Sequence, residues 1–568
     1  MKKDTLHPNF PERKWLRQDW QYLGILVLTG IILLFTGLSV RSLWGSEGRW
    51  AEIVREMLIS GNYFLPAING QTYFDKPLLS YWAIIPFAIN GVVTEVAART
   101  PGVMAGMGTV IITFVIGRRL FGSKTGFISS FLLLTSVMFV LWSRTASAEM
   151  LNVFAIWLSF WLFTAGAHHG SPVYVIFLYS ICAIASFFKG PVAPAVVFSS
   201  ITFYSVIEAL VQARKNGFTF SAIKEAILSK LRWIVSWHGF FGVLGGAAIF
   251  MIFLLMPVIF TGSWSSVELM WKENVQRFFQ PFDHIEPLYT YFKHIPVFFA
   301  PWTLFMLASL LDIRCWEKNI PERLIILLTL AIFIFFTISG SRRSYYILPI
   351  LPGLALITGK GITDWLTTAR EHANRWAVKS AAILTCSILI LAGIGIIIIF
   401  FDNRIPSHVS QLAIGAFAII AGSISLILFC KKIPQNGLVI LVLLVFVMEL
   451  WVFTVGMSVA EKKRTLRPFA LKAADYLKNV SDDKISLFQG YDSAFIFYLK
   501  RGPLRVLNTV EEIKAFQKMQ TDGFLIGDLS FISKFQQSGN LDGTSVIFIE
   551  KLDPKKHGDN LALFSLKK

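Results

Sequence analysis

Long apolar runs separated by short polar loops make up most of this chain of 568 residues. A helix needs about 20 apolar residues to cross a bilayer, and runs of about this length recur from Tyr22 to Thr454. The pattern therefore predicts an α-helical polytopic membrane protein with about thirteen transmembrane helices. We expect these spans near residues 22–40, 102–117, 126–142, 150–167, 173–188, 191–209, 235–260, 296–312, 323–339, 345–361, 380–401, 411–430 and 437–457.

One further apolar run, Pro77–Val93, is short for a span and is interrupted by Pro86 and Gly91. We interpret it as a re-entrant or interfacial segment, because counting it as a span would place the basic turn 118–124 outside the membrane, against the positive-inside rule. The charges then predict a cytoplasmic N-terminus and an external C-terminus. Two long external loops are expected, at residues 41–101 and 261–295.

The residues after the last span have a different pattern, in which short apolar runs alternate with helical periodicity. The apolar runs are Ile485–Phe488, Gly523–Ile526 and Ser545–Ile549, and the helical patterns are Thr465–Val480 and Thr509–Met519. This alternation predicts a small α/β domain. We therefore divide the chain into a transmembrane domain, 1–457, and an extracytoplasmic α/β domain, 458–568.

Composition agrees with a membrane protein, since 54% of the residues are hydrophobic and 15% are charged. Lys and Arg together number 53 against 35 Asp and Glu. This excess indicates either contact with anionic phosphate groups or topology signals that obey the positive-inside rule. The four cysteines form no disulfide framework or metal motif. Nucleic-acid motifs are absent, and the lack of a Walker-type phosphate loop argues against an ATP-driven pump.

The first external loop contains an amphipathic helical pattern that starts at Trp50. Trp50, Ile53, Val54, Met57 and Leu58 fall on one face, which predicts a helix lying on the membrane surface. Just before it, Glu47 and Arg49 allow two interpretations. They belong to an ordinary solvated helix start with Ser46 as N-cap, or they project into a site at the membrane interface.

Further charged and aromatic residues lie at the external ends of other spans. Lys76 precedes the membrane-dipping segment, where it binds either headgroups or a substrate phosphate. Glu149 begins a span, with Arg144 as a possible ion-pair partner, and a functional role and a structural ion pair are equally open. His284, in the second long loop, is a base, a metal ligand or an ordinary loop histidine. Residues 339–349 bring Arg342 and Tyr346 to one helix end, as a phosphate site or an interfacial anchor.

Together these residues form an inventory of carboxylates, cations and tyrosines on one face of the membrane. Such a set suits displacement of an anionic leaving group, because a carboxylate can accept the proton of an acceptor hydroxyl while cations stabilise the phosphate.

These segments, in this order, resemble the aminoarabinose transferase branch of the GT-C glycosyltransferases, which is related to the protein O-mannosyltransferases. The resemblance extends from about Leu43 to Pro352, and three motifs carry it. They are Glu47-Gly48-Arg49-Trp50-Ala51-Glu52-Ile53, Tyr73-Phe74-Asp75-Lys76-Pro77 and Tyr346-Ile347-Leu348-Pro349. It implies a polyprenyl-phosphate sugar donor and inversion at the anomeric carbon.

By position, the resemblance implies that Arg49, Tyr73, Lys76 and Tyr346 bind the donor phosphate, and our leading hypothesis adds Arg342 to them. Asp75 and His284 would line the cavity, and Glu149 would occupy the second acidic site. The first acidic site departs from the family pattern, since Asp-Glu is replaced by Ser46-Glu47. Three explanations follow: Glu47 takes the catalytic role, Glu149 carries it alone, or the protein binds a lipid-linked sugar without transferring it.

The leading hypothesis is an inverting glycosyltransferase with Glu47 or Glu149 as catalytic residue, located in the inner membrane of a bacterium. The acceptor is lipid A, another envelope glycan or a protein, and the surrounding partners are membrane lipids rather than nucleic acid. No cofactor is required, because cations already stabilise the leaving group, although a divalent metal is compatible with the sequence. The alternatives are a non-catalytic lipid-linked-sugar-binding protein and a flippase or transporter. A transporter predicts internal repeats and charges deep within spans, which are not evident.

Overall fold

The computed structural model describes residues 13–74, 76–169, 171–215, 219–231, 233–234, 236–272, 276, 286–311, 319–367, 375–402, 407–461, 465–490, 493–529, 544–550 and 561–566. The chain divides into two compact units. The helical unit comprises Met1–Thr36, Asp75–Ser80 and Arg99–Val452. The mixed unit comprises Gly37–Phe74, Tyr81–Ala98 and Phe453–Lys568.

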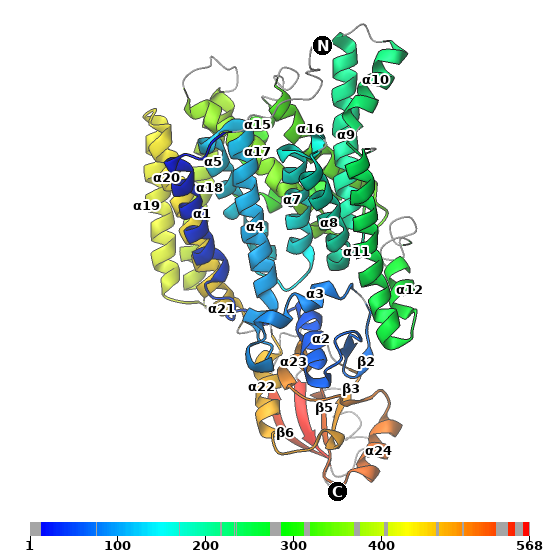
Figure 1. Ribbon diagram of the computed structural model, residues 1–568. Coiled ribbons are helices and arrows are strands. Elements are labelled where there is room, and N and C mark those ends of the chain that lie inside the picture. The colour runs from blue at the N-terminus through cyan, green and yellow to red at the C-terminus, as the bar shows by residue number, and fades with distance from the viewer. Residues whose placement is uncertain are drawn as a thin grey trace. The chain divides into compact units, whose positions relative to one another are not determined.

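The helical unit contains apolar helices of seven to 27 residues (Figure 1). They are α1 (Arg17–Phe35), α4 (Glu95–Phe121), α5 (Ser123–Leu134), α6 (Val137–Ser143), α7 (Glu149–Ala165), α8 (Pro172–Lys189), α9 (Val192–Lys215), α10 (Phe220–Leu231), α11 (Trp237–Thr261), α12 (Ser265–Trp271), α14 (Thr290–Phe298), α15 (Thr303–Leu310), α16 (Ile320–Ile338), α17 (Leu351–Leu366), α18 (Arg375–Phe401), α19 (Ser410–Cys430) and α20 (Pro434–Trp451). The 3-10 helices η3 (Ala167–His169) and η6 (Ser344–Ile350) lie between them.

Ten helices in the described part of the chain are long and apolar enough to cross a membrane. The bent pair α5 and α6, with 69° between its members, adds an eleventh if it counts as one span. The two other predicted spans correspond to α7, which has 17 residues, and to α14 and α15, which have 9 and 8. The fold class is therefore confirmed, and the total of thirteen spans stays a prediction.

Close helix contacts in this unit depend on small residues. A Cβ atom added at Gly359 of α17 would lie 2.8 Å from the backbone nitrogen of Ser129 in α5. Glycine removes this clash and lets the two helix backbones approach, as is common in membrane bundles. Elsewhere α19 packs between α18 and α20, and α8 packs against α7 and α11 (Figure 1).

The segment predicted to be re-entrant contains no membrane-spanning helix. It consists of α3 (Leu79–Trp82), η1 (Ile85–Phe87) and η2 (Ile89–Gly91), each of three or four residues. Asn90 and Gly91 both have positive φ, of 54° and 74°, which ends the chain's helical geometry there. Excluding residues 77–93 from the spans was therefore right.

The mixed unit contains a five-stranded sheet in the order β4-β3-β5-β7-β6. Its strands are β3 (Ile485–Phe488), β4 (Arg505–Leu507), β5 (Phe524–Asp528), β6 (Ser545–Glu550) and β7 (Leu561–Ser565). β4, β3 and β5 are parallel, whereas β7 runs antiparallel to β5 and β6. The sheet confirms the predicted small α/β region, although the short β4 and the final β7 were not foreseen. A separate hairpin joins β1 (Ala67–Ile68) and β2 (Gln71–Thr72).

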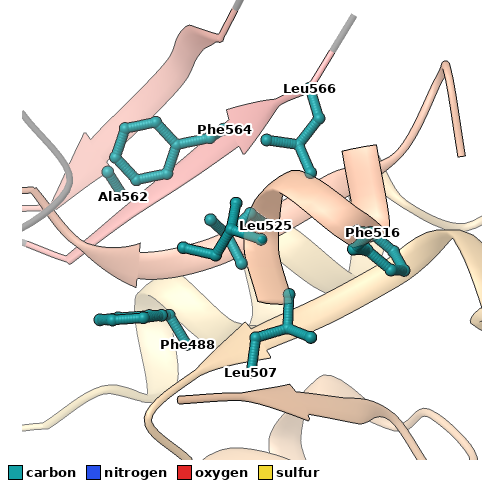
Figure 2. Close-up of a cluster of buried hydrophobic side chains, with 8 residues drawn as sticks. Phe488, Leu507, Phe516, Leu525, Ala562, Phe564 and Leu566 are labelled. Carbon is teal, nitrogen blue, oxygen red and sulfur yellow. The ribbon is translucent and has the colours of Figure 1, made fainter. Parts of the chain in front are cut away.

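Helices cover both faces of this sheet. On one face α24 (Val510–Met519) packs Ile513 and Phe516 against Leu525 and Phe564 (Figure 2). Successive strand residues point to opposite faces, so Phe524 points away from α24, and it contacts Tyr476 of α22 (Arg467–Tyr476) at a ring distance of 6.2 Å. The start of α24 is fixed locally by a capping box between Thr509 and Glu512.

The remaining elements of the mixed unit are α2 (Glu47–Ser60), the π-helical segment η7 (Val452–Gly456), α21 (Met457–Glu461), η8 (Asp482–Lys484) and α23 (Ser493–Leu499). The apolar face predicted for α2 exists and is buried against protein, whereas its expected place on the membrane surface stays a prediction. Trp50, Ile53, Val54 and Met57 are at most 5% exposed, and α2 packs against α23. A Cβ at Gly48 would lie 2.2 Å from the backbone nitrogen of Ala494. The apolar face of α2 therefore packs against protein.

Candidate active site

The candidate site in the helical unit is built around an ion pair between Glu149 and Lys189. Glu149 is the first residue of α7 and Lys189 is the last of α8, and these two consecutive helices pack together. The Lys189 Nζ donates to Glu149 Oε2 at 2.5 Å, and each side chain is 12% exposed. The carboxylate lies at a helix N-terminus and the ammonium at a helix C-terminus, so both charges are favoured by the helix dipoles.

Two tyrosines lie over the ammonium of this pair. Lys189 Nζ is 4.3 Å from the ring centroid of Tyr346 and 5.7 Å from that of Tyr345, both in η6. Arg343 donates from Nη1 to the Tyr345 hydroxyl at 2.8 Å, and the Tyr345 ring stands 4.4 Å from that of Trp142. These cation–π contacts and the hydrogen bond fix a polar, aromatic wall beside the carboxylate.

Two other cations lie near this ion pair. Lys76 and Arg343 both lie within electrostatic range of Lys189. Tyr291 is fully buried, its hydroxyl has no hydrogen-bond partner among the described residues, and it lies within electrostatic range of Tyr346, Arg342 and Glu149. One carboxylate surrounded by several cations and phenol groups leaves a positive excess, which suits an anion.

Arg342 lies in this group, but its guanidinium donates to two backbone carbonyls. Its Nε donates to the Thr337 carbonyl at 3.0 Å and its Nη1 to the Glu286 carbonyl at 2.5 Å. It therefore connects the end of α16 to the residues before α14.

Sequence reasoning missed the principal partner of Glu149. The expected partner, Arg144, instead donates to the carbonyls of Leu33 and Leu34 in α1 at 2.7 and 3.0 Å. Lys189 was overlooked because it was treated as the end of an apolar span. The only local signal was a charged residue between the aromatic run and Gly190-Pro191.

In the mixed unit, Glu47 is held by residues just before it in the chain. Glu47 Oε2 accepts from Arg41 Nη2 at 2.9 Å and from the Trp44 backbone N–H at 3.3 Å, and its side chain is 1% exposed. Ser46 occupies the N-cap position, but its side chain makes no capping hydrogen bond. Glu47 therefore binds the residues that precede α2. Because its side chain is buried, the solvated-face interpretation is wrong for this carboxylate.

Arg49 and Tyr73 form the second polar pair of the mixed unit. Arg49 Nη1 donates to the Tyr73 hydroxyl at 2.7 Å, and its guanidinium lies 5.9 Å from the ring centroid. The two residues are thus brought together, as their expected shared role requires, while their contact with a phosphate stays a prediction.

A third carboxylate, Glu52, lies one turn beyond Glu47 on α2. Both of its oxygens accept from Arg55, at 2.7 and 2.6 Å, and Arg55 also donates to the Arg501 carbonyl at 2.6 Å. Burial raises the pKa of Glu52 to about 7, although Arg55 opposes the shift. Glu52 is fully buried although it lies outside the apolar stripe of α2.

Two predicted cavity-lining residues, Asp75 and His284, lie outside the described residues. The site described above therefore does not include these two residues.

Comparisons with known proteins find a matching family model, similar relatives and solved structures of similar fold. The family model described as dolichyl-phosphate-mannose-protein mannosyltransferase matches residues 75–233. An undecaprenyl phosphate-alpha-4-amino-4-deoxy-L-arabinose arabinosyl transferase of Shewanella sediminis is 23% identical over 404 residues, covering 68% of this chain and 67% of the relative. An uncharacterized protein of Aquifex aeolicus is 27% identical over 342 residues, covering 59% and 62%.

Solved structures agree over nearly the whole chain. ArnT of Cupriavidus metallidurans in the apo state superposes with a TM-score of 0.72 at 16% identity, covering 96% of this chain and 98% of that one. The chain has the ArnT fold. The same protein bound to undecaprenyl phosphate gives a TM-score of 0.68 at 17% identity, with 97% and 98% covered. These findings confirm the resemblance to the GT-C glycosyltransferases.

Proposed function

We propose that this chain is an inverting glycosyltransferase that moves a sugar from a polyprenyl-phosphate donor to an envelope acceptor. The observation that carries the proposal is the Glu149–Lys189 pair beneath Tyr345 and Tyr346, in a chain with the ArnT fold. One similar structure holds undecaprenyl phosphate, and one relative is named for a transfer from it. Both support a lipid-phosphate donor.

The proposed reaction is a single displacement. The acceptor oxygen forms a bond to the anomeric carbon while the bond from that carbon to the phosphate oxygen breaks. The acceptor proton passes to a carboxylate, and polyprenyl phosphate leaves with the bonding electron pair and one additional negative charge. Lys189, with Lys76 and Arg343 in electrostatic range, would stabilise that charge, since such groups act most strongly where charge develops.

We assign the proton acceptor to Glu149 rather than to Glu47. A general base must come within hydrogen-bonding distance of the proton that it removes. Glu149 is 12% exposed and borders the cationic group, whereas Glu47 is 1% exposed and is engaged by Arg41. Ser46 in place of the family aspartate then leaves the second acidic site as the one that acts. Glu47 is proposed to position the start of α2.

The finer features are part of the same proposal. The donor carries a pentose or a hexose, and the acceptor is lipid A, another glycan or a protein. No metal is required, so chelation is expected to leave transfer unchanged. We place the protein in a bacterial inner membrane with the N-terminus in the cytoplasm and the residues after 457 outside. Labelling of single introduced cysteines from each side of intact cells tests this topology.

The deciding experiment follows radiolabelled sugar from polyprenyl-phosphate pentoses and hexoses to extracted envelope lipids and proteins. The full-length protein in nanodiscs is compared with Glu149→Gln and with Glu511→Gln, a matched change at an exposed position of α24. Transfer that is lost only in Glu149→Gln supports the proposal. Donor binding without transfer by the wild type would favour a sugar-lipid-binding protein, and donor movement between leaflets without transfer would favour a flippase.

A further inference from the structure

A pocket lies in the helical unit at the ends of α16 and α17 that are remote from η6. Tyr345 and Tyr346 precede the start of α17, whereas Lys360 and Asp364 lie near its end. Glu322 is in the first turn of α16, and Arg342 follows the end of that helix. Since α16 has 19 residues and rises about 1.5 Å per residue, the two places are roughly 28 Å apart along it.

The pocket has about 440 Å³ of empty space, which includes its open mouth. Ile325 and Ile326 of α16 and Ile357 of α17 supply an apolar wall, and Glu322, Lys360 and Asp364 supply charges. An apolar wall that ends in charged groups is the arrangement expected where a membrane helix reaches the headgroup region.

The charges of this pocket form one linked group. Lys360 Nζ is 3.3 Å from Glu322 Oε1 and also pairs with Asp364, one turn further along α17. Asn319 donates to the same Glu322 oxygen at 2.7 Å. The Lys360, Glu322 and Asp364 side chains are 19%, 18% and 30% exposed, so all three are accessible at the mouth. Two carboxylates against one ammonium leave one negative charge on the described lining.

We propose that this pocket binds the headgroup of a phosphatidylethanolamine lipid. The primary ammonium of ethanolamine has three N–H donors, and these match the carboxylate oxygens of Glu322 and Asp364. Its phosphate accepts from Lys360, and its acyl chains lie along the isoleucine wall. A choline headgroup has no N–H to donate, and a glycerol headgroup brings a negative charge without a positive one, so both bind more weakly.

The test measures lipid retention by the full-length protein with native mass spectrometry, using dioleoyl phosphatidylethanolamine, phosphatidylcholine and phosphatidylglycerol at equal concentrations. The wild type is expected to retain the ethanolamine lipid about tenfold over the choline lipid, the worth of one charge-assisted hydrogen bond. The double variant Glu322→Gln, Asp364→Asn is expected to lose this preference. Glu511→Gln, far along the chain on α24, is expected to keep it.

Equal retention of the ethanolamine and choline lipids by the wild type would overturn the proposal. So would an unchanged preference in the double variant, or stronger retention of phosphatidylglycerol. If the double variant does not fold, the single variant Asp364→Asn replaces it, because the Lys360–Glu322 pair remains. Lipid retention is read without any sugar transfer, so this result is independent of the proposed enzymatic function.

Discussion

The two units each contain a carboxylate paired with a cation, and the pairs differ in their surroundings. Glu149 and Lys189 come from separate helices, are partly exposed and stand beside two tyrosines. Glu47 and Arg41 are six residues apart, and the carboxylate is enclosed. An ion pair that brings distant elements together while it remains accessible can exchange one partner for a substrate. A local, enclosed pair instead holds its own segment in place.

Removing each carboxylate in turn tests whether the two ion pairs differ in function. Glu149→Gln is expected to lower transfer about 10²–10⁴-fold, the usual contribution of a general base, with donor affinity largely kept. Transfer at saturating donor measures the first quantity and equilibrium donor binding the second. Glu47→Gln is expected to act through folding, so its loss of transfer should follow the fraction of unfolded protein. Full transfer by Glu149→Gln would disprove the assignment of the base.

The buried Glu52 is expected to make the stability of the mixed unit depend on pH. Its folded pKa of about 7 lies above the ordinary glutamate value of 4.5, so the folded state binds more protons than the unfolded state between these pH values. The contribution of Glu52 to the stability of the mixed unit is therefore greatest below about pH 4.5 and falls as pH rises to about 7, by on the order of 3 kcal/mol.

Hydrogen exchange of α2 amides, corrected for the intrinsic pH dependence, measures this effect in the full-length protein. Glu52→Gln should flatten the profile between pH 4.5 and 7, whereas Glu511→Gln should not. A wild-type profile that rises with pH would show that Glu52 is not responsible.

A third comparison separates charge from packing at Lys189. Lys189→Ala is expected to weaken donor binding by about tenfold to a hundredfold, because it removes a charge-assisted phosphate contact and leaves Glu149 without its partner. Lys189→Arg should recover part of the affinity. Donor titrations at low and high salt check this, with Lys478→Ala on an exposed surface as control. An unchanged affinity in Lys189→Ala would remove Lys189 from the phosphate site.

The smallest expected effect tests the packing of α2. Gly48→Ala is expected to destabilise the mixed unit by about 1–3 kcal/mol, because its Cβ would meet the backbone of Ala494 at 2.2 Å. Gly24→Ala is the matched control, since a Cβ there meets nothing within 4 Å. Urea unfolding followed through the exchange of α2 and α23 amides compares the two variants. Equal stability of Gly48→Ala and the wild type would mean that the helices can separate at little cost.

Much of the local structure was predictable from the sequence because it depends on neighbours in the chain. The apolar runs gave ten helices of membrane-spanning length, and the helical pattern predicted over Thr509–Met519 corresponds to α24. β3 was predicted with its observed bounds, Ile485–Phe488. The period of the pattern and the capping residues act within a few positions, so they can be read without knowing what the element packs against.

The candidate site was predictable only in part. Glu149, Lys76 and Tyr346 were recognised as separate charged or aromatic groups at the ends of apolar runs. Lys189 was not, because its partner lies 40 residues away and is reached only when α7 and α8 pack as neighbours. Arg144 was preferred because it is near in sequence, yet its side chain points to the end of α1.

The sequence by itself determined the class of the protein, the helices and strands with strong periodicity, and the motifs that resemble the GT-C transferases. The tertiary structure decided which charges meet and which apolar faces are buried. The face of α2 shows the reason. Periodicity identifies an apolar stripe, but lipid and a protein surface exclude water equally well, and only the packing of α23 against Gly48 selects between them.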